Sequence, residues 1–280
     1  MIVDFHTHVF PPQLVRERER LAQDEALFAE LYGDPAARLA TAADLPASMD
    51  AAAIDVSVIL GFAWRDPDLC RRHNDYLLQA AAESNGRLVP FCNLPLGAGA
   101  ETLEAEARRC LALGARGFGE LRPESQDCDT AGPAGEALAA IATQAGMPLL
   151  FHVSEPVGHA YPGKAGFSLS AFAAFTAAHP GVRVVGAHWG GGLPFYALMP
   201  EVAALLAAAC FDTAASSLLY GPDIYERGVE LAGAERVLFG SDFPLLAQSR
   251  SRRRIESSGL DPAAKALVLG ENARRLLGLE

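Results

Sequence analysis

Basic residues are scarce in this chain. Its 23 lysines and arginines stand against 34 aspartates and glutamates, which gives a formal net charge of -11 at pH 7. Such a surface repels phosphate backbones and anionic lipid surfaces. We therefore expect neither nucleic acid nor a membrane as partner, and a nuclease is disfavoured. A small anionic substrate stays compatible because local arginines can override the global field, and so does assembly into a homo-oligomer.

Paired cysteines and long apolar runs are also missing. The five cysteines are odd in number, widely spaced and without a CxxC motif, which is typical of a reduced intracellular protein. No apolar run approaches the roughly 20 residues that span a bilayer. The opening stretch MIVDFHTHVF carries aspartate and histidine, which a signal-peptide core does not tolerate. We expect a cytoplasmic protein.

A glycine-rich phosphate loop is absent after the first apolar run, which argues against an open doubly wound sheet. Short apolar runs, typical of parallel strands buried on both faces, alternate with Ala- and Leu-rich helical stretches. Strands are predicted at residues 2–8, 56–63, 88–95, 116–123, 148–155, 183–190, 209–213 and 237–244. Helices are predicted at residues 74–84, 100–113, 134–144, 168–178, 194–207 and 221–231. This alternation predicts an α/β fold, a closed (β/α)8 TIM barrel, as a single domain over residues 1–280.

A long connection, at about residues 10–53, separates the first two predicted strands. Its stretch RERERLAQDEALFAEL, residues 16–31, predicts a helix with a solvated face. Loops at the carboxyl ends of barrel strands form the active-site rim, so this insertion is a candidate lid. The glycines at 190–192 predict a tight turn that lets the backbone pass close to the site.

Histidines gather at predicted strand ends. In a strand, residues i and i+2 point to the same side, so His6 and His8 aim two imidazoles into one space. Their Cα atoms lie about 7 Å apart by the strand rise, which suits one Zn²⁺ ion. His152 and His188 end the fifth and sixth predicted strands. A core histidine bonded to a carbonyl would explain one such residue, but hardly four.

Two carboxylates complete the candidate site. Asp242 follows the last apolar strand, where it would face His6 and His8 across the barrel seam and could ligate a metal or accept a proton. An Asx turn or a helix cap is the alternative for this aspartate. Glu120 ends the fourth strand, either as a carboxylate that bridges two metals or as the partner of Arg122 in a surface ion pair.

Three further residues are candidates for substrate binding. Arg122 could hold a substrate carboxylate with its planar guanidinium fork, although a structural ion pair would explain it equally well. Trp64 and Trp189 flank predicted strand ends and could wall the pocket, and packing on the rim is the alternative for both.

These residues, taken in order, resemble the amidohydrolase superfamily: HxH on strand one, His on strands five and six, and Asp on strand eight. The flanking residues 4–8, 240–244 and 270–273 are similar to those of amidohydrolase family 2, which includes aminocarboxymuconate-semialdehyde decarboxylase and lactone hydrolases. The resemblance covers nearly the whole chain. It implies the barrel fold and a divalent metal, most commonly zinc.

One departure from the superfamily pattern concerns the metal count. Many members bridge two metals with a carbamylated lysine on strand four, but Lys164 and Lys265 are the only lysines here and neither lies there. The site is then mononuclear, held by His6, His8, His152 and Asp242 with His188 beside the water. Alternatively it is binuclear, with Glu120 shared between two ions.

The leading hypothesis is a metal-dependent hydrolase that cleaves a lactone, amide or ester with a metal-activated water. Asp242 would accept the proton of the water, and His188 would orient the water or stabilise the oxyanion. The alternative is a non-oxidative decarboxylase on the same metal site, in which His188 serves protonation of carbon. A hypothesis of another class is a metal-binding protein without turnover.

Overall fold

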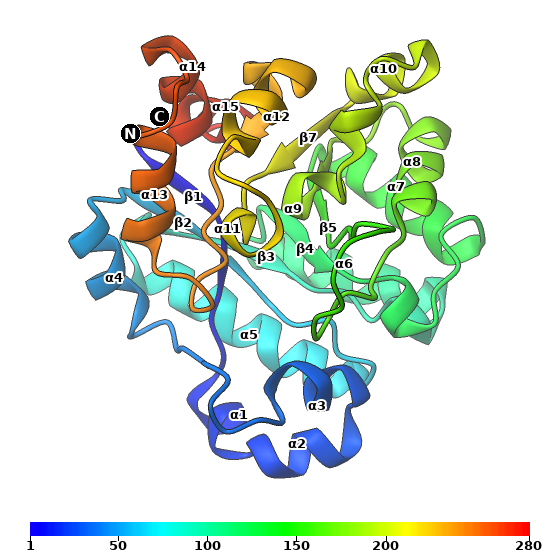
Figure 1. Ribbon diagram of the computed structural model, residues 1–280. Helices are drawn as coiled ribbons and strands as arrows, with labels where there is room; N and C mark the ends of the chain where they lie inside the picture. The colour runs from blue at the N-terminus through cyan, green and yellow to red at the C-terminus, as the bar shows by residue number, and fades with distance from the viewer.

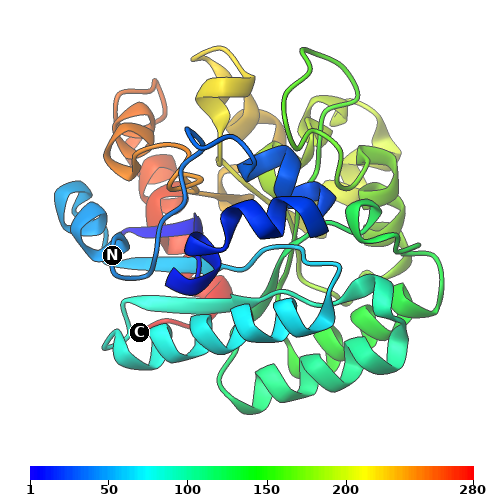
Figure 2. The same cartoon turned by 90° about the horizontal axis from the view of Figure 1, so that it is seen from below.

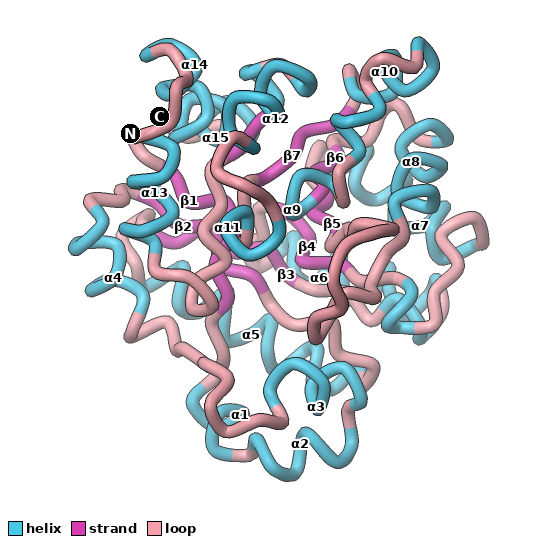
Figure 3. Tube along the Cα trace, in the orientation of Figure 1, coloured by secondary structure: helices cyan, strands magenta, loops and turns pink.

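The computed structural model describes residues 1–280, and eight strands form one parallel sheet in sequence order. They are β1 (Val3–His8), β2 (Val56–Leu60), β3 (Leu88–Cys92), β4 (Gly117–Leu121), β5 (Leu149–Phe151), β6 (Val184–Gly186), β7 (Ala209–Asp212) and β8 (Val237–Leu238). Hydrogen bonds from Phe5 N to Phe239 O (2.7 Å) and from His8 N to Phe243 O (2.6 Å) join β1 to the chain of β8. The predicted TIM barrel is confirmed, with its strands at the centre of Figure 3.

The strands begin where the apolar runs begin, but most end early. Each starts within one residue of its predicted position, and seven of the eight end earlier than predicted. The largest difference is at β8, which ends at Leu238, followed by equal differences at β5, which ends at Phe151, and β6, which ends at Gly186. Beyond these points the chain leaves the ladder and turns across the mouth of the barrel. The apolar pattern continues through that turn because its residues are buried there too.

Helices surround the barrel (Figure 1). Those after β2 include α5 (Pro67–Glu83), α6 (Ala100–Ala112), α7 (Pro133–Ala145), α8 (Leu169–Ala178), α10 (Pro200–Leu206), α12 (Ile224–Ala232), α13 (Gln248–Glu256), α14 (Pro262–Ala266) and α15 (Asn272–Leu277). The expected helix at 194–207 is divided into a 3₁₀ turn, Leu193–Tyr196, and α10. No helix is at once long and apolar enough to cross a bilayer.

The core has two layers, because each strand is buried on both faces. The larger cluster packs strand residues such as Phe118, Phe151 and Phe211 against the surrounding helices. The smaller one contains residues of most strands, among them Phe5 and Phe91, whose rings meet edge to face at 5.4 Å. Aromatic pairs in this geometry add a modest energy beyond the area that they bury. The second cluster therefore plugs the barrel beneath its mouth.

The insertion between β1 and β2 forms four short helices, α1 (Pro12–Arg16), α2 (Arg18–Asp24), α3 (Ala26–Tyr32) and α4 (Leu45–Ala52). The single helix expected over residues 16–31 is wrong, because Glu17 separates α1 from α2 and the extended Glu25 separates α2 from α3. Its buried carboxylate accepts hydrogen bonds from Arg65 N and Asp66 N (3.3 and 3.1 Å). This bond ties the insertion to the segment after β2. Figure 2 shows α1–α3 in blue across the near face.

Gly117 on β4 tests how tightly the barrel is filled. A Cβ at this position would lie 2.4 Å from Cζ of the fully buried Phe91 ring. We expect Gly117→Ala to lower the free energy of unfolding by about 1–3 kcal/mol, since overpacking forces neighbours off their preferred rotamers. The measurement is urea unfolding followed by circular dichroism. Gly181→Ala is the control, because its Cβ would make an ordinary contact of 3.8 Å with Thr143; equal stability of both variants would contradict the prediction.

Candidate active site

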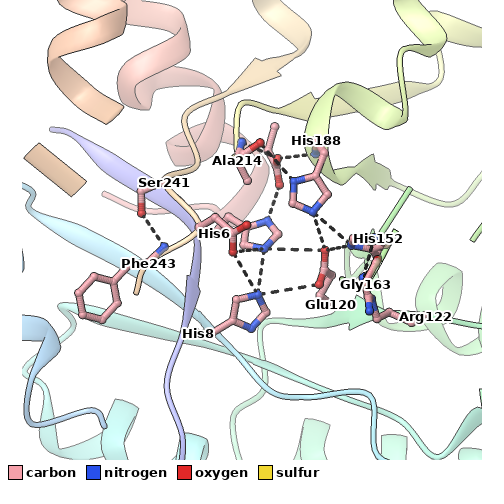
Figure 4. A network of polar contacts seen from close by, with 12 residues as sticks. His6, His8, Glu120, Arg122, His152, Gly163, His188, Ala214, Ser241 and Phe243 are labelled. Atoms are coloured by element: carbon pink, nitrogen blue, oxygen red, sulfur yellow. Dashed lines mark hydrogen bonds and ion pairs between the residues drawn. The ribbon is translucent and has the colours of Figure 1, made fainter. Parts of the chain in front are cut away.

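The paired histidines of β1 point into the mouth of the barrel (Figure 4). A register shift between Asp4 and Thr7 interrupts the pairing of β1 with β2 just where the histidines begin. Such a bulge changes the direction of the side chains that follow it. The Nε2 atoms of His6 and His8 lie 3.1 Å apart. Two imidazoles that share one metal ion at about 2.1 Å have their nitrogens at about this separation.

Asp242 reaches the same point from the other side of the barrel seam. Its backbone N–H donates to His6 O (2.9 Å), and its φ of 66° lies in the left-handed region. A non-glycine residue in this conformation is uncommon and costs free energy, so the surrounding structure must impose it. Its Oδ1 lies 3.7 Å from Nε2 of both His6 and His8.

Glu120 lies between these residues and two further histidines. Its Oε1 is 2.9 Å from His152 Nδ1 and 3.3 Å from His188 Nε2. The same oxygen is 3.8 Å from His6 Nε2, and Oε2 is 3.9 Å from His8 Nε2. The structure thus brings together all six residues that the sequence singles out as metal ligands. One alternative for Glu120 was a surface ion pair with Arg122. The structure shows no such pair, because the Glu120 carboxylate turns into the site.

The sequence places His188 at the end of a strand, but in the structure it lies in a turn. All five residues from His188 to Gly192 have positive φ, which ends β6 two residues before the histidine. Three consecutive glycines make the turn accessible, and a Cβ at Gly191 would lie 2.7 Å from Ser154 O. The expected close passage of the backbone therefore occurs against the chain that follows β5.

Asp212, at the end of β7, contacts the candidate site and was missed by the sequence analysis. Its Oδ2 accepts a hydrogen bond from His6 Nδ1 (2.8 Å), and its Oδ1 accepts from His188 N and Ala214 N (both 2.9 Å). The carboxylate fixes the orientation of the His6 ring and holds a proton on Nδ1, so that Nε2 is the nitrogen that faces the site. The sequence did hold a signal for Asp212: it is an aspartate at the end of an apolar strand, similar in position to Asp242.

Buried carboxylates dominate the electrostatics of the site. Burial opposes a charge on His6, but the carboxylates of Asp212, Glu120 and Asp242 outweigh it and raise the pKa of His6 to about 10. Burial likewise opposes the charge of Glu120, yet the neighbouring histidines hold its pKa well below the usual range. Three anionic groups around a few imidazoles therefore favour positive charge at this point.

Other site residues are held neutral. Burial, followed by the positive charge of Arg122, lowers the pKa of His152 to about 3. Burial and the proximity of Asp242 raise the pKa of the Tyr32 phenol, so that this hydroxyl keeps its proton over the physiological range.

The donor set fits a divalent cation. Three groups of three His or acidic residues each place their ligand atoms within 4.8 Å of one another. The groups are His6, His8 and Glu120; His6, His188 and Asp242; and Glu120, His152 and His188. Imidazole nitrogens together with carboxylate oxygens suit Zn²⁺, Mn²⁺ and Fe²⁺.

A cavity of about 700 Å³ opens over this cluster. Arg122 lines it, is only 5% exposed, and donates from Nη2 to His152 Nε2 and Gly163 O (both 2.6 Å). Its Nε and Nη1 have no partner in the protein. Apolar side chains, including Phe62, Leu218 and Leu245, form much of the remaining wall. The insertion contributes Leu31 and Tyr32 to the lining.

The two tryptophans expected at the pocket do not line it. Trp64 is fully buried and donates from Nε1 to His73 Nδ1 (3.0 Å). Trp189 is buried and donates from Nε1 to Ser216 Oγ (2.8 Å). Both indoles therefore support the wall from behind. His159 and Tyr161, to which the sequence assigned no role, do line the cavity.

The sequence matches one protein family over nearly its whole length. The family model described as amidohydrolase matches residues 3–279. The chain belongs to the amidohydrolase family. No curated protein sequence matches this amidohydrolase.

Solved structures resemble this amidohydrolase over its full length. 5-carboxyvanillate decarboxylase from Sphingomonas paucimobilis gives a TM-score of 0.83 at 16% identity, over 100% of this chain and 99% of that one. 2,6-dihydroxybenzoate decarboxylase from Rhizobium gives 0.75 at 20%, over 99% and 98%. Dihydroxybenzoic acid decarboxylase from Polaromonas sp. JS666, with bound manganese and 2-nitroresorcinol, gives 0.74 at 18%, over 99% and 97%. At these identities the likeness establishes the barrel fold.

Asp212→Asn isolates the orienting role of Asp212. The amide oxygen must keep accepting from two backbone N–H groups, so the amide NH2 faces His6 Nδ1 and moves the proton of the ring to Nε2. We expect the affinity for Zn²⁺ or Mn²⁺ to fall about 10- to 100-fold. Competition with a chromogenic chelator measures this affinity. Asp24→Asn, on the exposed face of α2, is the control; equal affinity of the two variants would refute the assignment.

Proposed function

We propose that this amidohydrolase is a metal-dependent carboxy-lyase, which releases CO2 from a small aromatic carboxylic acid without oxidation. The observation that carries the proposal is the guanidinium of Arg122, buried beside the metal donors with Nε and Nη1 unpartnered. A buried cation without a counterion is costly, so an anionic group of the substrate is its natural partner. The decarboxylases with the same fold support this choice of reaction.

The cavity provides complementary surfaces for such a substrate. Arg122 and the donor cluster lie within reach of one carboxylate, because Nη2 is 2.6 Å from His152 Nε2. Phe62, Leu218 and Leu245 offer an apolar wall to a ring. Apolar walls remove water from the carboxylate, which loses its charge as CO2 forms. The strong negative charge of the whole protein is overridden locally by these groups.

The donor cluster would hold the metal through His6, His8 and Asp242, with Glu120, His152 and His188 as the further ligands. When bound, a divalent cation supplies Lewis-acid chemistry that draws electron density from the substrate oxygens. Arg122 orients the reacting carboxylate. Asp212 keeps His6 in the tautomer that leaves Nε2 free.

The proton transfer falls to Asp242. The bond between the ring carbon and the carboxylate breaks, CO2 leaves, and the electron pair stays on the ring carbon. The carboxylate of Asp242 takes up a proton from solvent and delivers it to that carbon, which forms the new C–H bond and leaves Asp242 ionised again. The side chain of Asp242 is 13% exposed, against 7% for His188, and lines the cavity, so it has access both to substrate and to solvent. His188 stays a candidate ligand and takes no part in this transfer.

Hydrolysis is the second candidate, and the position of Glu120 favours it. This carboxylate lies between His6 and His8 on one side and His152 and His188 on the other. Such an arrangement is suited to two metal ions that share one carboxylate, and paired ions commonly assist hydrolysis. Asp242 would then accept a proton from the attacking water. The number of metal ions per chain therefore distinguishes the two candidates.

The reaction is tested with hydroxybenzoates and their carboxylated relatives as substrates. We expect release of CO2 with formation of the corresponding phenol, loss of activity on treatment with a chelator, and recovery on addition of Mn²⁺ or Zn²⁺. Plasma mass spectrometry of untagged protein, purified without chelator, should give one ion per chain. Two ions per chain, together with cleavage of a lactone or ester panel and no CO2, would establish hydrolysis in place of decarboxylation.

Asp242→Asn separates proton transfer from metal binding. The amide keeps an oxygen ligand but carries no transferable proton, so we expect turnover to fall at least about 100-fold. Metal content should stay at half of the wild-type level or above. Asp223→Asn, exposed before α12, is the control and should retain full turnover. A variant at 242 with wild-type turnover would remove Asp242 from the mechanism.

A further inference from the structure

Tyr32 is the one tyrosine that the insertion places in the cavity. It is the last residue of α3, and it lines the cavity together with His8, Arg122 and Asp242. Neither the fold nor the metal site requires a hydroxyl here. The residue comes from the connection between β1 and β2, outside the strands that carry the ligands.

Three phenyl rings hold the Tyr32 ring in place. The ring centroids lie 5.2 Å from Phe10, 5.3 Å from Phe28 and 5.9 Å from Phe62. Phe10 and Phe28 are fully buried, so their own positions are fixed by the core of the insertion. A phenylalanine at position 32 would satisfy all of these contacts. Packing therefore explains the ring but not the hydroxyl.

The hydroxyl of Tyr32 has no hydrogen-bond partner in the protein, whereas two other half-buried tyrosines have one. Tyr76 Oη accepts from Ala42 N (2.8 Å), and Tyr161 Oη donates to Glu155 Oε2 (2.8 Å). Buried phenols usually find a partner, and an unpaired one that lines a cavity is available to a ligand. Because the phenol is neutral, it can donate to an oxygen atom.

We propose that Tyr32 is a specificity-determining residue, whose hydroxyl donates a hydrogen bond to an oxygen substituent on the substrate ring. This inference rests on the proposed function, in which the donor cluster and Arg122 hold the reacting carboxylate. The substituent is a second oxygen, phenolic or carbonyl, on the part of the ring that faces α3. The insertion then selects among aromatic acids, while the barrel strands perform the chemistry.

The size of the effect follows from the energy of one neutral hydrogen bond. Its net worth of about 1 kcal/mol corresponds to roughly fivefold in affinity. A site that is built to pair with a substrate hydroxyl also discriminates against the analogue that lacks it. Discrimination should therefore appear as a difference between two probes that differ by a single oxygen.

The experiment is isothermal titration of the Mn²⁺-loaded protein with benzoate, 3-hydroxybenzoate and 4-hydroxybenzoate. We expect at least one hydroxybenzoate to bind the wild type about fivefold more tightly than benzoate. Tyr32→Phe should abolish this advantage and leave benzoate affinity, metal content and urea stability unchanged. Tyr196→Phe, at an exposed tyrosine outside the cavity, is the matched control and should keep the advantage.

Three results would overturn the proposal. The first is a hydroxybenzoate advantage that persists in Tyr32→Phe, and the second is an equal weakening of benzoate and hydroxybenzoate, which indicates a purely structural role. The third is a wild type that binds the probes without discrimination or not at all. Binding is measured without turnover, so a protein that discriminates but releases no CO2 would contradict the proposed function and leave the role of Tyr32 standing.

Discussion

The closure of β1 against the chain of β8 is the constraint on which the site depends. Hydrogen bonds run from Phe5 N to Phe239 O and from His8 N to Phe243 O, and Asp242 N donates to His6 O. These bonds join residues more than 230 positions apart in sequence. They hold the histidines of the first strand beside the aspartate after the last one, and the remaining ligands lie around this seam.

Charge explains why the cluster has this composition. Glu120, Asp212 and Asp242 bring three carboxylates into a largely buried space, which is costly unless cations compensate. Protons on histidine compensate in part, as the raised pKa of His6 indicates. A divalent cation can supply the same compensation and release those protons. Metal binding and the ionisation of these histidines are thus coupled.

The strands and the loops supply different parts of the site: most candidate ligands come from the strands, and most of the cavity wall comes from the loops. Of the candidate ligands, four lie on a strand or directly after one, and two lie in the turns that follow β6 and β8; the four are His6, His8, Glu120 and His152, and the two are His188 and Asp242. Part of the cavity wall comes from the insertion and from the segment after β5, which meet where Gly163 N donates to Glu30 Oε1 (2.7 Å) and Gly163 O accepts from Arg122. This division lets a single scaffold retain its metal chemistry while the wall changes its substrate.

The sequence by itself determined the barrel and the six residues that gather at the candidate metal site. Alternating apolar runs placed every strand start within one residue, and the spacing of His6 and His8 followed from the period of a strand. Tertiary structure decided the rest. Asp212 can orient His6 only because barrel closure brings the end of β7 within hydrogen-bond distance of this histidine of β1. The sequence places the two tryptophans at the pocket wall, and the structure buries them behind it. Local sequence does not show which way an indole near a strand end faces. Tyr32 reached the cavity because Glu25 breaks the helix, and that break depends on backbone partners 40 residues away.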